Sequence, residues 1–226
     1  AYMYQACTPE NRALCQVFFS APYPAGIGDT PRRRLIDFDE AGIDISCDEG
    51  SGARYSHAVK GMRVCKPGNY SKNTKLTIKL AIEAGDPDLP EHSYGSTLHP
   101  RMWLHLSQDT GTTTEAFLDF IENNVMRTFG PQEPERTMIW DDLDAYKANI
   151  IYFTVYRAGH RIVCRPSYRL KFGPTEYFFA QLCNGVRRHA DRIRSVEDLI
   201  NAVYAVAGSM SGFDAMFRHC GYNFDL

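Results

Sequence analysis

The sequence lacks the long apolar runs, paired cysteines and internal repeats that define several classes of protein. No run approaches the roughly 20 apolar residues that a membrane-spanning helix needs, and the first residues lack the order of a signal peptide. The seven cysteines are odd in number and form no CxxC pair, which favours reduced thiols over disulfides or a zinc knuckle. The histidines show no HxH or HxxxH spacing, and no glycine-rich phosphate loop is present. We therefore expect no membrane span, no zinc site and an intracellular protein.

What is present is an ordinary globular composition. The chain has 226 residues, of which 44% are hydrophobic and 23% charged, which excludes long disorder and is ample for a buried core. It begins with Ala rather than Met, so we expect a fragment of a longer protein. A Pro- and Gly-rich stretch at 21–31 predicts a boundary. We expect residues 1–32 to be a helix and linker that follow an upstream region, and residues 33–226 to be the main domain.

The net charge of −2 hides two basic segments. Residues 54–79 carry seven Lys and Arg and no acid, and residues 161–194 carry eight Lys and Arg against two acids. Two such segments on an acidic background would form a phosphate-binding surface if the fold brings them together. The alternative is that both are merely solvated faces.

The hydrophobic pattern predicts one mixed α/β domain. Strands are expected at 33–42, 54–65, 74–84, 136–142 and 161–166. Helices are expected at 9–20 and 145–159 and from Thr114, Pro174 and Ser195 onward. Residues 85–112, which contain the short apolar piece MWLHL, are expected to be a loop or hairpin insertion. This order predicts one sheet flanked by helices.

Three acids stand where such a fold could use them. Asp39 and Asp141 lie where predicted strands leave the sheet, and Glu176 lies in the first turn of a predicted helix. Together in a desolvated site they could not all stay ionised without a cation, and hard oxygen donors favour Mg²⁺ or Mn²⁺. Paired ions of this kind drive phosphoryl transfer. Singly, an Asp after a strand can make a turn and a Glu can stabilise a helix dipole. Asp37, on the same strand face as Asp39, competes for the first position.

Four strings, in order, resemble the catalytic-domain motifs of the mariner-like DDE transposases. They are DEAG at 39–42, ARYSHAVKGMRV at 53–64, IWDDLDAYK at 139–147 and RPSYRLKFGPTEYFF at 165–179. The 34 residues between Asp141 and Glu176 match a gap characteristic of one branch of that family. FRHCGY at 217–222 resembles the family's C-terminal segment, so the resemblance covers roughly residues 9–222.

The resemblance implies a ribonuclease H-like fold and a metal-dependent active site. It implies that Asp39, Asp141 and Glu176 are the catalytic residues and bind two Mg²⁺ or Mn²⁺ ions. One ion would activate water or a DNA 3′-hydroxyl, and the other would stabilise the leaving oxygen. Asp39 is preferred to Asp37 because it begins the DEAG string.

The resemblance further implies DNA as the partner, both transposon ends and target DNA, with a homodimer in the DNA complex. Such a protein would be nuclear in a eukaryote and otherwise intracellular. The residues we expect to contact DNA are Lys60, Arg63, Arg165, Tyr168, Arg169 and Lys171.

Several neighbours of the acids depart from the family pattern. Asp142 and Tyr146 replace the usual Asn and His, and four positions of the Pro-rich segment differ. These are Ser167, Arg169, Leu170 and Gly173. The leading hypothesis is a DNA endonuclease and strand transferase. The alternatives are a domesticated or decayed transposase that binds DNA or protein without cutting, and an unrelated α/β domain whose acids are structural.

Overall fold

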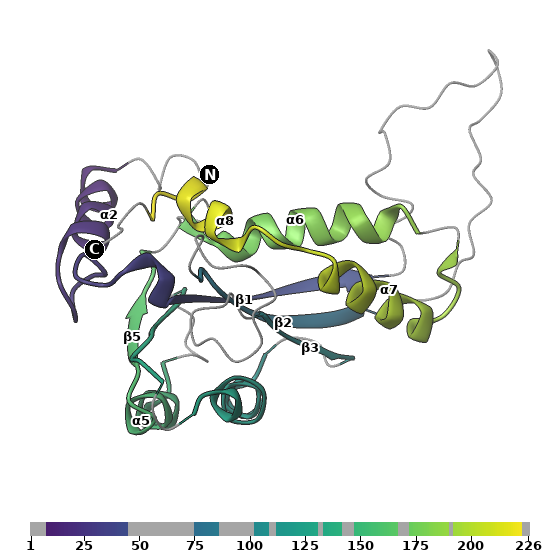
Figure 1. The fold of residues 1–226 in the computed structure, drawn as a ribbon, viewed down its shortest axis with the longest axis horizontal. Helices are drawn as coiled ribbons and strands as arrows, with labels where there is room; N and C mark the ends of the chain where they lie inside the picture. Colours follow the sequence, from purple (N-terminus) through teal and green to yellow (C-terminus); the bar gives the residue numbers. More distant parts are fainter. Residues whose placement is uncertain are drawn as a thin grey trace, which may run out of the picture.

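A five-stranded mixed sheet forms the centre of the computed structural model (Figure 1). The structure describes residues 8–44, 75–85, 102–108, 112–130, 133–141, 147–166, 172–189 and 192–222. The strands are β1 (Leu35–Asp44), β2 (Lys75–Glu83), β3 (Met102–Ser107), β4 (Thr137–Trp140) and β5 (Arg161–Cys164). Their order is β3-β2-β1-β4-β5, with β2 antiparallel to β1 and β3, and with β4 and β5 parallel to β1. The predicted mixed α/β fold is confirmed.

The edge strand β3 corrects the sequence prediction. We expected MWLHL to belong to a loop or hairpin insertion, yet it pairs with β2 in the register Leu80↔Leu104. Trp103 is buried and its indole Nε1 donates a hydrogen bond to Thr128 Oγ1 at 3.1 Å. A six-residue strand carries too little alternation to be distinguished from a loop, so its pairing partner defines it. The strand predicted at 54–65 lies outside the described residues.

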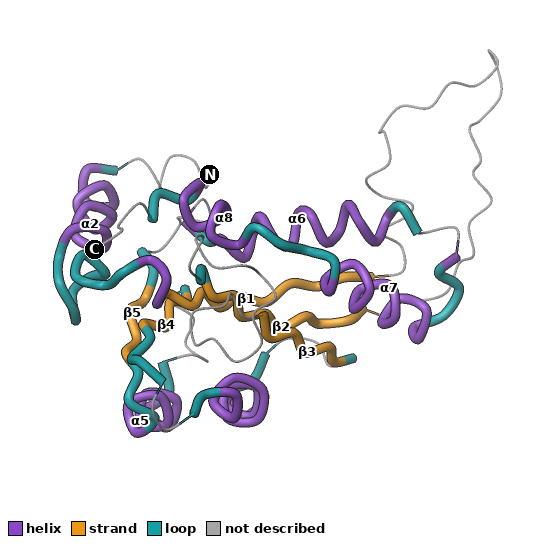
Figure 2. Tube along the Cα trace, in the orientation of Figure 1, coloured by secondary structure: helices purple, strands orange, loops and turns teal. Residues whose placement is uncertain are grey.

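Three helices cover one face of the sheet (Figure 2). They are α6 (Pro174–Arg187), α7 (Val196–Gly208) and α8 (Phe213–His219). Phe178, Leu182 and Val186 form the apolar side of α6 and lie in one core with Leu35 of β1. The start of α7 is the predicted capping box, in which Ser195 and Asp198 bond reciprocally.

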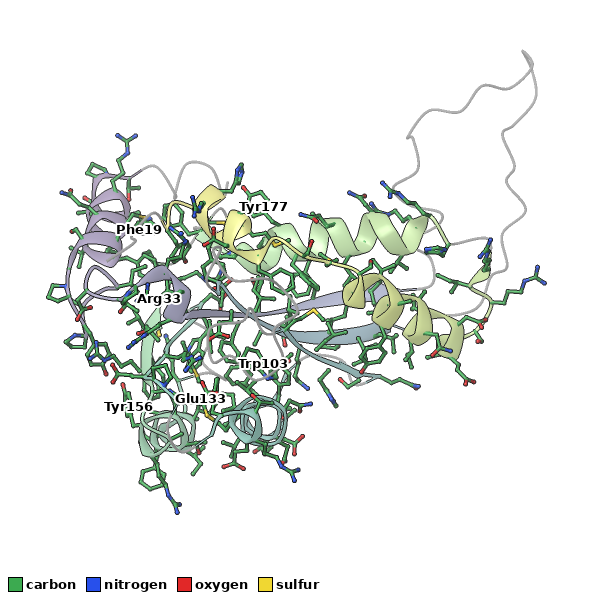
Figure 3. The ribbon with its side chains drawn as sticks, in the orientation of Figure 1. Phe19, Arg33, Trp103, Glu133, Tyr156 and Tyr177 are labelled. Atoms are coloured by element: carbon green, nitrogen blue, oxygen red, sulfur yellow. The ribbon has the colours of Figure 1, made fainter. Side chains whose placement is uncertain are left out.

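The opposite face carries a second, aromatic core. It is covered by α4 (Thr114–Asp119), the π-helical turn η2 (Phe120–Val125), the 3₁₀ turn η3 (Met126–Thr128) and α5 (Asn149–Arg157). The rings of Phe38 and Phe117 each meet Trp140 edge to face with centroids 5.5 Å apart. Figure 3 shows Trp103, Glu133 and Tyr156 on this side of the sheet and Tyr177 on the other.

The segment before β1 packs against the main domain. Helix α2 (Pro9–Ser20) begins as predicted, with Pro9 in its first turn and Thr8 as its cap, and the 3₁₀ turn η1 (Arg32–Arg34) leads into β1. Phe18 and Ile27 lie in the same core as Leu35, and the Ile27 N–H donates to the Phe18 carbonyl at 2.8 Å. Gly26 permits this turn, because a Cβ there would stand 2.5 Å from the Phe18 carbonyl oxygen. Ile27, within the Pro- and Gly-rich stretch at 21–31, is therefore part of this core.

Two further findings concern the described part of the chain alone. None of its helices combines the length and the apolar character needed to cross a bilayer. Its four cysteines, Cys15, Cys164, Cys183 and Cys220, are free thiols.

A buried charged cluster lies where β4 begins. Arg136 is 1% exposed, and its Nε lies 2.9 Å from Glu83 Oε1 while its Nη1 lies 2.8 Å from Glu133 Oε2. His160 is buried beside it and accepts a hydrogen bond at Nδ1 from the Arg136 N–H at 3.2 Å. Burial first, and then the Arg136 charge against the weaker effect of Glu133, lowers the pKa of His160 to about 4. The imidazole is therefore neutral in the folded protein near pH 7.

This histidine predicts a pH-dependent stability. Because its folded pKa lies below the unfolded value, its contribution is complete above about pH 6.5 and is lost as the pH falls toward 4. The free energy of unfolding should drop by up to about 3 kcal/mol from this group. His160→Asn, which keeps an acceptor for the Arg136 N–H and does not titrate, should show a smaller drop. Urea titrations at pH 4.5, 5.5 and 7 measure this; parallel curves for parent and variant would contradict it.

Candidate active site

The strand register places two predicted acids and one arginine side by side. β1 and β4 pair in parallel as far as Asp37↔Ile139, and Asp39 and Asp141 each follow that pair by two residues. Trp140↔Cys164 likewise brings Asp141 beside Arg165, whose N–H donates to the Trp140 carbonyl at 2.7 Å. Neighbouring strands lie about 4.8 Å apart. We call Asp39, Asp141 and Arg165 the charged row.

Alternation along the strands turns the charged row toward α6. Leu35, Ile139 and Val163 lie in the core beneath α6, whereas Phe38, Trp140 and Ile162 lie in the aromatic core. Residues an even number of positions from the first set share its face. The side chains of the charged row therefore point to the α6 side of the sheet.

Glu176 joins this row from the first turn of α6. Burial, followed by the negative charges of Asp39 and Asp141, raises the pKa of Glu176, while Arg165 opposes the change. The Glu176 carboxyl therefore experiences the negative charges of both aspartates. Its position at the start of α6 places it on the same side of the sheet as Asp39 and Asp141.

Asp37 precedes Asp39 by two residues on the same face of β1 and is fully buried. Its Oδ2 accepts hydrogen bonds from the Thr175 backbone N–H at 3.1 Å and from the Thr175 hydroxyl at 2.8 Å. Burial, only partly offset by Arg165 and these hydrogen bonds, raises the pKa of Asp37 to about 7. Asp37 therefore anchors the start of α6 to β1, whereas Asp39, whose side chain is 15% exposed, is the aspartate that solvent reaches.

Arg165 is not the exposed DNA ligand that the sequence predicts. It is 5% exposed, and its guanidinium lies between Asp37 and Asp39. Burial lowers the pKa of Arg165, but the carboxylates of Asp37 and Asp39 raise it by more, so the group stays charged. An arginine at the end of a strand pairs with whichever acids the neighbouring strands present, and the register decides which these are.

The five other residues that we expect to contact DNA lie outside the described residues, so their roles stay predictions. They are Lys60, Arg63, Tyr168, Arg169 and Lys171.

The basic residues of the two segments that the structure does describe lie in different places. Lys79 is buried on the aromatic-core side of β2, away from the acids, as its alternation with Leu80 requires. Arg161 pairs with Asp29 and Glu135 at the opposite end of β5. Of the basic residues in the described parts of these two segments, Arg165 is the one that lies between the acids.

The end of α6 presents a separate basic group. Arg187, Arg188, Arg192 and Arg194 are exposed there. Because α6 has 14 residues and rises about 1.5 Å per residue, this group lies roughly 20 Å along the helix from its start. The expectation that the second basic segment surrounds the acids therefore does not hold for these residues.

The donor set fits a hard divalent cation. Asp39, Asp141 and Glu176 lie on one side of the sheet and contribute carboxylate oxygens. Arg165 contacts Asp37 and Asp39 and acts electrostatically on Asp141 and Glu176, so carboxyl groups outnumber the cation. Within the part of the chain that the structure describes, no three metal-ligating side chains already stand in a coordination arrangement.

Two residues of this site were not identified from the sequence. Thr175 holds Asp37 through two hydrogen bonds, and Gly173 lies directly against the Arg165 guanidinium. Gly173 departs from the family pattern, and that departure is the available signal in the sequence. Its packing against Arg165 explains why glycine stands there.

The architecture, a five-stranded mixed sheet with helices on both faces, is a ribonuclease H-like fold. The chain has the fold of the catalytic domain of Mos1 mariner transposase, with a TM-score of 0.55, 9% identity, and coverage of 93% of this chain and 84% of that one. It is similar to a Mos1 transposase paired-end complex with left transposon end (TM-score 0.63, 13% identity, 92% of this chain). It is equally similar to a pre-cleavage Mos1 transpososome (TM-score 0.64, 12% identity, 93% of this chain).

These likenesses are structural. The chain spans 56% of the transposase chain in the paired-end complex and 57% of that in the pre-cleavage transpososome. No family model matches the sequence, and no curated protein matches it. At identities of 8 to 13% the comparisons with Mos1 show the fold.

Proposed function

We propose that this chain is the catalytic domain of a transposase that cleaves DNA at transposon ends and joins it to target DNA. The observation that carries the proposal is that Asp39, Asp141 and Glu176 lie on one side of a ribonuclease H-like sheet, where the charges of both aspartates raise the pKa of Glu176. The Mos1 structures of this fold include complexes with Mn and with Mg, which supports a divalent cofactor.

The residues of this chain would act as follows. Asp39, Asp141 and Glu176 would hold two Mg²⁺ or Mn²⁺ ions, which activate the attacking water or 3′-hydroxyl and stabilise the leaving oxygen. Thr175 and Asp37 would fix the start of α6 against β1 and so keep Glu176 over the two aspartates. The rigid strand register would maintain the separation of Asp39 and Asp141 during the reaction.

The test of this proposal is nicking of DNA that carries the ends of the element, with Mg²⁺ or Mn²⁺ and with EDTA. Cleavage with either ion and none with EDTA is the expected result. If DNA is bound but never cut under any metal condition, the domesticated or decayed alternative holds instead. Size measurement of the DNA complex tests the proposed homodimer, and the nuclear or intracellular location is proposed with the function.

DNA binding should be electrostatic and largely independent of sequence. We expect Lys60→Ala with Arg63→Ala to weaken binding to all DNA about equally. Each phosphate contact contributes about 0.9 to the slope of log K against log salt, so the slope should flatten by about 2. The control is Arg127→Ala with Arg157→Ala, which removes the same charge. Both arginines are exposed and lie in the helical layer that covers the aromatic core. Titrations at several salt concentrations measure this, and equal slopes for both double variants would show that Lys60 and Arg63 do not contact phosphates. Lys171→Ala should reduce cleavage more than binding.

A further inference from the structure

The Arg165 guanidinium occupies the centre of the acid site. Its Nη2 donates to the Phe38 carbonyl at 3.2 Å and lies 3.5 Å from Asp39 Oδ2, while its Nη1 lies 3.6 Å from Asp37 Oδ2. Its charge also acts on Glu176 and interacts with Asp141. A single buried cation is thus shared by all four carboxyl groups.

The backbone is shaped to admit this guanidinium. At Gly173, directly before α6, a Cβ would stand 2.1 Å from Arg165 Nη1 and 3.3 Å from Arg165 Cζ. Any other residue would push the guanidinium away from Asp39 or shift the start of α6. The same Cβ would lie 3.3 Å from Glu176 Cγ, so this glycine also sets how closely the third acid approaches.

Asp39 already has partners for both carboxylate oxygens. Its Oδ1 accepts from the Glu40 N–H at 2.8 Å. Its Oδ2 faces Arg165 Nη2 at 3.5 Å and the Thr175 hydroxyl at 3.4 Å. A cation at Asp39 Oδ2 would therefore meet a fixed positive charge.

We propose that Arg165 is a resident cation of the acid site that takes the place of one divalent ion, so that the DNA-free chain binds one ion among Asp39, Asp141 and Glu176. This inference rests on the proposed function, because it concerns the same three acids. It makes Arg165 a positioning residue, which orients Asp39 and holds the start of α6 without metal.

The experiment is a count of Mn²⁺ ions by electron paramagnetic resonance and calorimetry on DNA-free protein. The key variant is Arg165→Met with Asp37→Asn, which removes the guanidinium together with the buried carboxyl group that it contacts and keeps an acceptor for the Thr175 N–H. Arg165→Met alone would leave Asp37 buried without its cation and is expected to lower the melting temperature. The matched control is Arg136→Met with Glu83→Gln, a buried pair at the opposite end of β4.

We expect one Mn²⁺ per parent chain and per control chain, and two per chain of the Arg165 double variant. The first ion should bind the double variant at least about tenfold more tightly, since a nearby positive charge has been removed. Arg165→Lys, which keeps the charge, should still bind one ion. Two ions on the parent, or identical counts and affinities for parent and double variant, would overturn the inference.

The failure of this inference is distinguishable from failure of the proposed function. A parent that binds two ions and cleaves DNA with metal overturns the role of Arg165 and leaves the transposase proposal intact. A parent and a double variant that bind no Mn²⁺ overturn both.

Discussion

Asp141→Asn and Glu176→Gln are each expected to lower DNA cleavage by about 10³-fold or more while leaving the protein folded. Each change would remove one oxygen ligand of the proposed metal ions, which would supply several kcal/mol of transition-state stabilisation. The fold should survive, because Asp141 is one of the charges that raise the pKa of Glu176 and its neutralisation relieves that repulsion. The melting temperature of Asp141→Asn should therefore stay equal or rise.

A control at Glu115 tests the alternative that Glu176 only stabilises the dipole of its helix. Glu115 also lies in the first turn of a helix, α4, but in the opposite layer from the acid site. Both residues interact with a helix dipole, so Glu115→Gln and Glu176→Gln should cost similar small amounts of stability, under about 1 kcal/mol. Only Glu176→Gln should abolish nicking. Equal cleavage by Glu176→Gln and the parent would remove Glu176 from the site.

Arg136→Met is expected to lower the free energy of unfolding by about 3–5 kcal/mol. Arg136 and Glu83 are each 1% exposed, so the variant leaves a carboxylate in the interior without the guanidinium that balances it. Adding Glu83→Leu should recover most of the loss, since an apolar replacement of a buried ion pair is often close to neutral. Urea unfolding of the parent, the single variant and the double variant measures both effects.

Arg161→Met supplies the comparison for Arg136. Arg161 also contacts two acids, Asp29 and Glu135, but it is about one-third exposed, at 32%. Solvent screens such pairs, so this change should cost within about 1 kcal/mol. If Arg136→Met were no more costly than Arg161→Met, burial would not be what makes the Arg136 cluster important.

The local sequence determined those strands and helices that show a clear apolar period or a characteristic helix-start residue. Alternation of apolar residues marked β1 and β2, and the three-and-four spacing of Phe178, Leu182 and Val186 marked α6. Pro174 and the Ser195–Asp198 pair fixed two helix starts, because a proline in the first turn and a capping box act within one helical turn. The order of the motif strings was enough to infer the ribonuclease H-like fold.

The tertiary structure alone decided which charges meet. Arg161 begins β5, and Arg165 directly follows the last residue of that strand. Arg165 nevertheless pairs with acids of the candidate site, whereas Arg161 pairs with Asp29 and Glu135. Lys79 likewise faces the aromatic core, because a shift of one residue reverses the side of a strand. Registers between strands far apart in sequence come from packing of the whole sheet, so composition and periodicity cannot assign them. The three acids could be named from the sequence, but the guanidinium among them could be placed only by the fold.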